Sequence, residues 1–370
     1  MPCVGYRKLC ERSREVHMLH SITEVLFWDS ETYIPPEAIP YRADQLSYLK
    51  AKAHMLLIEP CVDDWLKESE DFGFSADSQE ASNIREWRRA HGRATKLPVS
   101  LVERFEKVRT IARDAWAQAR IESKFVHFKP HLEEIVELAR KKTDLWGYEE
   151  SPYNALMEDY EPGTKASQLM VVFEELRIAL VGLLGKLTTD PISERYRDGH
   201  YPVAGQQALS REVAAAFGYD FRAGRIDTTA HPFQISLGPS DTRITTRYSE
   251  KRFEVSFYGA LHETGHALYE QGLNKELFGL PVGQAVSLGI HESQSRLWEN
   301  HVGRSLPFWC FWHAAAIKHL PGLAHYSPSD LAVVYSELLL LLSGSKPMKS
   351  HMTFTFCSDL ELSWSSSKVN

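Results

Sequence analysis

The chain has 370 residues, of which 43% are hydrophobic and 25% are charged, and its formal net charge is -7. A chain of this size can bury a large core, in a single large domain or in two lobes. Basic and acidic residues alternate along the sequence, so no basic face emerges and we expect no nucleic-acid partner. Residues 1–16 are charged and the longest apolar run, 338–342, is short, so we expect neither a secretory signal nor a membrane-spanning helix.

The cysteines are odd in number and widely spaced: Cys3, Cys10, Cys61, Cys310 and Cys357. This pattern fits reduced thiols in a cytosol better than a disulfide framework, and no cysteine has metal-ligand spacing. We therefore expect a soluble, cytoplasmic protein.

Helical periodicity dominates the first two thirds of the chain. Apolar residues at helical spacing predict one helix around 132–139 and another around 169–187. Apolar stripes of this kind usually face a core, and we expect these two to do so. The sequence has no repeat, low-complexity linker or long charge run that would mark an internal domain boundary.

Between 227 and 247 the pattern changes to Thr, Ile and aromatic residues, with turn residues at Gly238, Pro239 and Ser240. This pattern predicts a β-hairpin inside an otherwise helical chain. The hairpin is either an ordinary surface feature or an edge strand that holds an extended peptide by backbone hydrogen bonds.

The pentapeptide His262-Glu263-Thr264-Gly265-His266 is the most informative motif. Residues four apart lie on one helix face, so His262 and His266 can bind one metal ion while Glu263 holds a metal-bound water. A string of this form arises by chance in roughly one chain in twenty of this length, and a solvated helix face is the alternative. Apolar and aromatic neighbours at helical spacing favour a half-buried helix.

The surroundings of the pentapeptide support a metal site. Gly265 lies inside the predicted helix, where glycine costs about 1 kcal/mol relative to alanine, so we expect something to approach its backbone there. A glycine-rich run between 272 and 289 ends this helix, and 290–300 predicts a second one that carries Glu292. A catalytic zinc site takes three protein ligands and leaves a fourth position open, so Glu292 is the expected third ligand.

At this point the sequence resembles the carboxypeptidase Taq family of zinc metallocarboxypeptidases. Four elements in a fixed order carry the resemblance: His231-Pro232-Phe233, the D-x-R-x-T element at 241–245, the pentapeptide, and 291–300. Weaker matches extend the coverage to about residues 6 to 330. The resemblance implies a mainly α, elongated, two-lobed, neurolysin-like scaffold with a small β-sheet beside the active-site cleft, and a homodimer.

The resemblance further implies that single residues are removed from the C-termini of peptide substrates. Zn²⁺, or Co²⁺ or another divalent metal, would be held by His262, His266 and Glu292 and would acidify a bound water. Glu263 would accept the proton of that water and pass it to the departing amine. A zinc endo-oligopeptidase uses the same motif and remains the alternative among enzymes.

Two further residues are candidates for binding substrate. His231 and Arg243 could donate hydrogen bonds to the oxyanion of the reaction. The alternatives are a hydrogen-bonded core histidine at 231 and an internal ion pair between Arg243 and Asp241. Spacing does not identify the arginine that would hold the substrate carboxylate.

The sequence departs from the family near residue 333. The family carries a block similar to A-D-E-V-T-Y-x-x-H-I-x-x-R-F, whereas 345–360 read S-K-P-M-K-S-H-M-T-F-T-F-C-S-D-L. Plausible codons for this stretch, read in a neighbouring frame, can spell the missing block. We therefore expect 1–332 to be a catalytic domain that is incomplete at its C-terminus, and 333–370 to be an aberrant, frameshifted tail. A naturally divergent tail and an inactive, truncated gene product are the alternatives.

Overall fold

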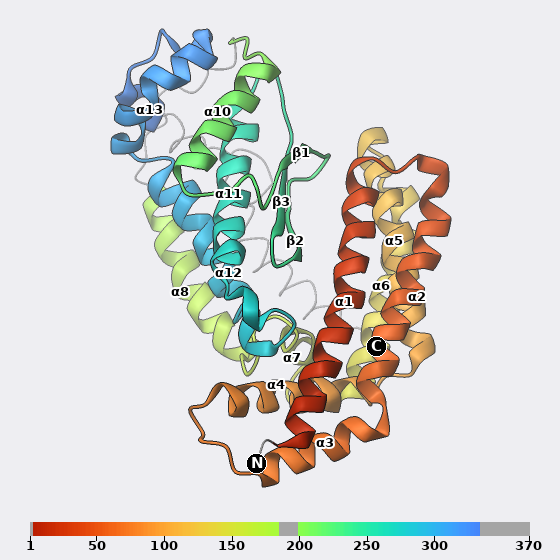
Figure 1. Cartoon of the computed structure of the whole chain (residues 1–370). Helices are drawn as coiled ribbons and strands as arrows, with labels where there is room; N and C mark the ends of the chain where they lie inside the picture. The colour runs from red at the N-terminus through yellow and green to blue at the C-terminus, as the bar shows by residue number, and fades with distance from the viewer. Residues whose placement is uncertain (1–2, 185–198, 334–370) are drawn as a thin grey trace. The chain divides into compact units, whose positions relative to one another are not determined.

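The computed structural model describes residues 3–184 and 199–333 (Figure 1). Within these ranges the chain is mainly helical and contains one three-stranded sheet, as the sequence predicts. None of the helices in the described ranges is long and apolar enough to cross a membrane. The expected aberrant tail lies, apart from Val333, outside the described residues.

The described chain divides into two compact units, each built from discontinuous segments. Of the described residues, the first unit contains 3–147, 220–245 and 267–286, and the second contains 148–184, 199–219, 246–266 and 287–333. No local feature of the sequence marks these boundaries, because each unit is defined by contacts between segments that are far apart along the chain.

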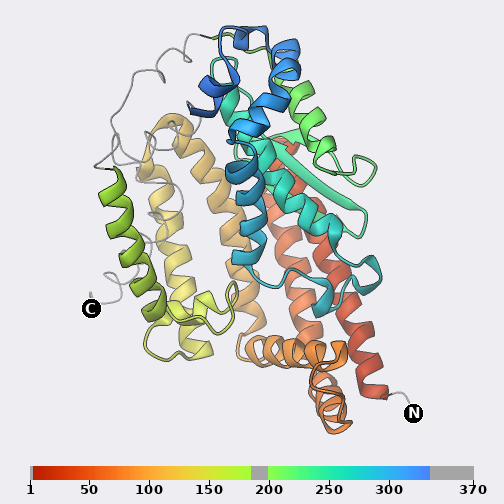
Figure 2. The same ribbon diagram turned by 90° about the vertical axis from the view of Figure 1, so that its left-hand side faces the viewer.

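The first unit is dominated by long helices. α1, α2, α5 and α6 pack side by side, and α3 and α4 lie across one end of α1 and α2 (Figures 1 and 2). A core of Leu9, Leu66 and Trp87 joins α1, α3 and α4. The helices of this unit are α1 (Val4–Thr32), η1 (Pro36–Ala38), α2 (Ile39–Ile58), α3 (Pro60–Asp71), α4 (Gln79–Ala94), α5 (Val99–Glu122), α6 (Phe125–Trp146), η3 (Lys275–Leu277) and η4 (Pro281–Gly283).

The hairpin predicted from 227–247 is present. β1 (Ile226–Thr228), β2 (Gln234–Gly238) and β3 (Asp241–Thr246) form a sheet in the order β1-β3-β2, with β2 antiparallel to β3 and at one edge. Alternation along β2 buries Ile235 and Leu237, which pack against Trp28 of α1.

The second unit is built around a large aromatic core. Phe253, Phe257 and Tyr258 on α11 pack with Phe308 and Trp309 on α13. The helices that begin in this unit are α7 (Pro152–Met157), α8 (Ala166–Leu184), α10 (Val203–Ala216), α11 (Phe253–Gly272), α12 (Leu288–Arg296), the π-helical segment η5 (Leu297–Val302), α13 (Leu306–His319) and η6 (Pro321–Leu323).

The core stripes expected at 132–139 and 169–187 are wrong in part, although both helices form, as α6 and α8. Leu132 and Val136 on α6 are exposed, and so are Leu176 and Leu183 on α8. Helical spacing fixes which residues share a face, but burial also needs a partner against that face. No such partner lies over these side chains in the described part of the chain.

Candidate metal centre

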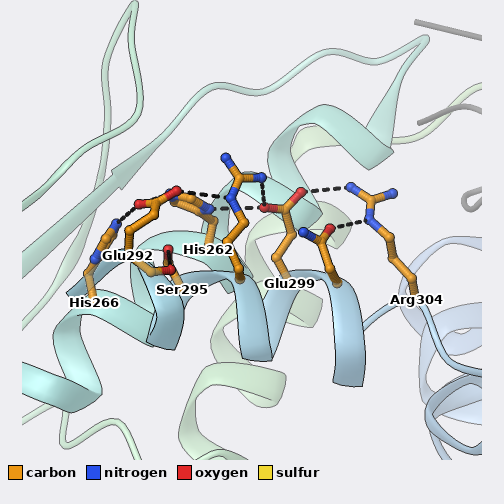
Figure 3. Close-up of polar contacts among 8 residues, drawn as sticks. His262, His266, Glu292, Ser295, Glu299 and Arg304 are labelled. Carbon is orange, nitrogen blue, oxygen red and sulfur yellow. Dashed lines mark hydrogen bonds and ion pairs between the residues drawn. The ribbon is translucent and has the colours of Figure 1, made fainter. Parts of the chain in front are cut away.

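His262 and His266 project from the same face of α11, and Glu292 meets them from α12 (Figure 3). His266 Nε2 lies 3.1 Å from Glu292 Oε2, and His262 Nε2 lies 3.6 Å from the same oxygen. One ligand atom from each of the three residues lies within 4.8 Å of the other two. Two imidazole nitrogens and a carboxylate oxygen are the donors of His₂Glu zinc sites, so the three residues fit a divalent metal.

Gly265 explains how the two helices that carry the candidate ligands come so close. A Cβ at this position would lie 2.6 Å from both Ser295 Cα and the carbonyl oxygen of Gln294, so only glycine fits. The sequence predicts a close approach to the backbone of Gly265, and this prediction is confirmed. The approaching backbone belongs to α12, which also carries Glu292.

α12 begins one turn before Glu292. The hydroxyl of Ser287 accepts a hydrogen bond from the N–H of Ile290 at 3.2 Å and caps the helix. The predicted helix, 290–300, is observed as α12 followed directly by η5, so the α-helical hydrogen bonding changes to a π-turn at Leu297.

Glu263 is buried, with 6% of its surface exposed. Burial raises the pKa of Glu263 to about 7, although the charge of His262 opposes this shift. A carboxyl group that titrates near neutral pH can both accept and donate a proton, which is the property needed by a general base and acid.

Glu292 has the opposite electrostatic environment. Burial alone would raise the pKa of Glu292, but the hydrogen bond from His266 and the charges of His262 and Arg296 lower it to about 2. Arg296 Nε contacts Glu292 Oε1 at 2.9 Å, which leaves Oε2 facing the two histidines. Glu292 is therefore held as a carboxylate, the form that binds a cation.

The sequence analysis did not identify the polar residues that support the candidate metal ligands. Glu299 contacts His262, and Arg304 contacts Glu299 (Figure 3). His291 stacks on His266, with ring centroids 4.5 Å apart. The spacing of seven residues between Glu292 and Glu299, two helical turns, was a usable signal that both carboxylates share a face.

The two candidate substrate residues belong to the first unit. His231 is exposed in the loop between β1 and β2, and its ring lies against Trp116 at 6.4 Å. Arg243, on β3, makes a bidentate ion pair with Asp241, at 2.8 and 2.7 Å, and its guanidinium lies over Trp28. The alternative of an internal ion pair at Arg243 is thus observed, and a core position for His231 is not. A role for either residue in binding substrate stays a prediction.

Comparison with known proteins identifies a metallopeptidase family. A family model described as carboxypeptidase Taq (M32) metallopeptidase matches residues 8–333. The chain belongs to this family. The thermostable carboxypeptidase 1 of Thermus thermophilus is 42% identical over 325 residues, which are 83% of this chain and 63% of that protein. Carboxypeptidase 1 of Bacillus subtilis is 31% identical over 309 residues, 82% of this chain and 60% of that protein.

Solved structures of the carboxypeptidase Taq family share the fold. The M32 carboxypeptidase from Deinococcus radiodurans has a TM-score of 0.75 and 33% identity, over 89% of this chain and 67% of that one. A structure of Pyrococcus furiosus carboxypeptidase has a TM-score of 0.79 and 29% identity, over 90% of this chain and 68% of that one. The chain thus spans less than two thirds of the length of the first two curated relatives.

Proposed function

We propose that this chain is a metal-dependent carboxypeptidase, which hydrolyses single residues from the C-termini of peptides. The observation that supports the proposal is the convergence of His262, His266 and Glu292 on one point, with Glu263 buried on the same helix. Membership of a metallopeptidase family and curated relatives named carboxypeptidases add to this support.

His262, His266 and Glu292 would hold the metal, and zinc is the proposed ion because the His₂Glu set leaves a fourth position open. When bound, the metal would supply Lewis acidity and would lower the pKa of water at this position. Glu263 accepts the proton of the attacking water and then donates it to the departing amine. The pKa of Glu263, about 7, suits both transfers because the group gains and loses a proton at little cost near neutral pH.

The remaining proposals concern substrate contacts, domain bounds, oligomeric state and location. His231 and Arg243 are proposed contacts of the substrate, residues 1–332 the catalytic domain, and 333–370 an aberrant tail. A homodimer and a cytoplasmic location rest on family resemblance and on the spacing of the cysteines. Light scattering tests the dimer. Sequencing of the coding DNA tests the tail, since a frameshift requires a family-like frame that stays open beyond the codon for Asn370.

The decisive experiment uses two peptides that differ only at the C-terminus, one with a free carboxylate and one amidated. A carboxypeptidase releases a free amino acid from the first peptide only, because it must recognise the terminal carboxylate. Mass spectrometry should show this release, its loss with a chelator, and its return with Zn²⁺. Cleavage of each peptide into two shorter peptides would indicate an endo-oligopeptidase. Metal binding without any cleavage would indicate an inactive product.

A further inference from the structure

Glu299 lies directly behind one of the proposed metal ligands. Its Oε2 is 2.9 Å from His262 Nδ1, on the opposite side of the imidazole from the nitrogen that faces Glu292 (Figure 3). The Glu299 side chain is only 10% exposed. A buried carboxylate in this place has lost most of its water, so its protein contacts govern where it points.

Two arginines hold the Glu299 carboxylate. Arg296 Nη1 contacts Oε2 at 3.0 Å, and Arg304 Nη2 contacts Oε1 at 2.8 Å. Arg304 is itself fixed, because it donates to Asn300 Oδ1 at 3.0 Å and its guanidinium stacks over the Tyr258 ring at 3.9 Å. Charge-assisted contacts at both oxygens leave the carboxylate little freedom to turn away from His262.

The backbone around Glu299 is π-helical. Glu299 lies within η5, where the N–H of Gly303 donates to the carbonyl of Trp298, five residues earlier, at 2.9 Å. Short π-helical segments inside helices occur frequently at functional sites. A Cβ at Gly303 would lie 2.5 Å from Leu261 Cδ2, so the end of η5 packs tightly on α11 beside His262.

The two histidines are supported differently. A neutral imidazole carries one N–H, and a carboxylate at Nδ1 selects the tautomer that carries its proton there, which leaves the lone pair on Nε2 for a metal. His262 has such a partner. The Nδ1 of His266 is buried and has no hydrogen-bond partner in the described residues.

We propose that Glu299 is a positioning residue that fixes His262 as the Nδ1–H tautomer and aims its Nε2 at the metal position shared with His266 and Glu292. The inference rests on the proposed metal site. Carboxylates behind metal-bound histidines orient the ring and make it a better ligand, and their loss usually weakens metal binding by about 10- to 100-fold. Glu299 binds no metal itself; it acts through His262.

The first test reads the tautomer in metal-free protein, so it does not depend on metal binding or activity. Long-range ¹H–¹⁵N spectra of protein labelled at histidine, recorded at a pH high enough to keep the His262 ring neutral and with that ring assigned by its absence in His262→Asn, should show the Nδ1–H form. Glu299→Ala should give a mixture of tautomers. Glu254→Gln, which breaks an ion pair with Arg252 elsewhere on α11, should keep the wild-type form.

The second test measures the Kd for Zn²⁺ by competition with a chromophoric chelator. Glu299→Ala should bind about 10- to 100-fold more weakly than wild type. Glu299→Gln, which keeps an oxygen acceptor but loses the charge, should lie between them. Arg304→Met leaves Glu299 in place but removes one of the two arginines that contact it, so its loss of affinity for Zn²⁺ should be smaller. This variant provides the test if the Glu299 variants do not fold.

An Nε2–H tautomer in the wild-type protein would overturn the proposal, and so would a wild-type Kd in folded Glu299→Ala. Lower thermal stability of the variants with unchanged tautomer and Kd would assign Glu299 a structural role only. If wild-type protein binds no divalent metal, the proposed function fails, but the tautomer of metal-free His262 still decides whether Glu299 positions it.

Discussion

Gly265 of α11 lies against Ser295 of α12 so closely that a Cβ on Gly265 would come within 2.6 Å of the Ser295 Cα. The neighbouring atoms are backbone atoms of α12, which cannot move aside as a flexible side chain could. Because α12 also carries Glu292, this contact sets the distance between the third proposed ligand and the two histidines.

Gly265→Ala should therefore damage both the fold and the metal site. Overpacking of this kind costs about 1–3 kcal/mol, measured as the free energy of unfolding in urea. The Kd for Zn²⁺ should also rise, because α12 must shift with Glu292. Gly92→Ala on α4 is the matched control: apart from the adjoining backbone of α4, no atom of the described residues lies within 4 Å of a Cβ there, so it should stabilise by about 0.5–1 kcal/mol. Equal behaviour of the two variants would contradict the close-contact argument.

His266→Ala should abolish tight metal binding, because two ligands with an open coordination sphere hold a divalent ion poorly. After dialysis, elemental analysis should give about one zinc per wild-type chain and almost none in the variant. His325→Ala, which removes an exposed histidine of the same unit, should retain zinc as wild type does. Stoichiometric zinc in His266→Ala would show that the metal is bound elsewhere.

Glu263→Gln should keep the metal but lose at least about a hundredfold in kcat, because a carboxamide cannot accept the proton of the attacking water. Zinc content and peptide turnover are measured on the same preparation. Turnover close to that of wild type would mean that a different group acts as the base.

Protonation of His20, on α1, should contribute to the pH dependence of the free energy of unfolding. Burial lowers the pKa of His20 from 6.5 to about 3 in the folded protein. The unfolded chain therefore binds more protons between these values, and the free energy of unfolding falls as the pH drops from 6.5 towards 3, by at most about 1.4 kcal/mol per pH unit.

His20→Gln removes this proton uptake, so its unfolding free energy should decline less steeply than that of wild type over the same pH range. Urea unfolding at a series of pH values measures the difference. His127→Gln, at an exposed position of the same unit, controls for the loss of an imidazole. Parallel pH profiles for wild type and His20→Gln would refute the prediction.

The exposed apolar side chains of α8 should promote self-association. Val171 and Ile178 are each 60% exposed, and other apolar residues of the helix are exposed beside them. Ile178→Lys should increase the soluble, non-aggregated fraction measured by size-exclusion chromatography, because it interrupts this apolar surface. Gln168→Lys adds the same charge at an exposed polar position of α8 and should have a smaller effect.

Local sequence patterns predicted the features that depend on near neighbours in the chain. The spacing of His262 and His266 placed both rings on one helix face, and turn residues at 238–240 located the hairpin. A glycine inside a helix indicated a close approach to its own backbone, because few other reasons justify its cost there, but the sequence did not identify the approaching group. Each of these inferences needs only the period of a helix or strand and the conformational limits of a residue.

Only the tertiary structure determined which helix faces are buried and which side chains contact the proposed metal ligands. Leu132 and Leu176 follow a helical stripe but are exposed, because burial depends on a partner that the stripe does not specify. Glu299 and His262, whose contact joins η5 to α11, are 37 positions apart in the sequence. Arg304 contributes to this site because it contacts Glu299. Sequence period determines the face of one helix, whereas the packing of two helices determines which side chains meet.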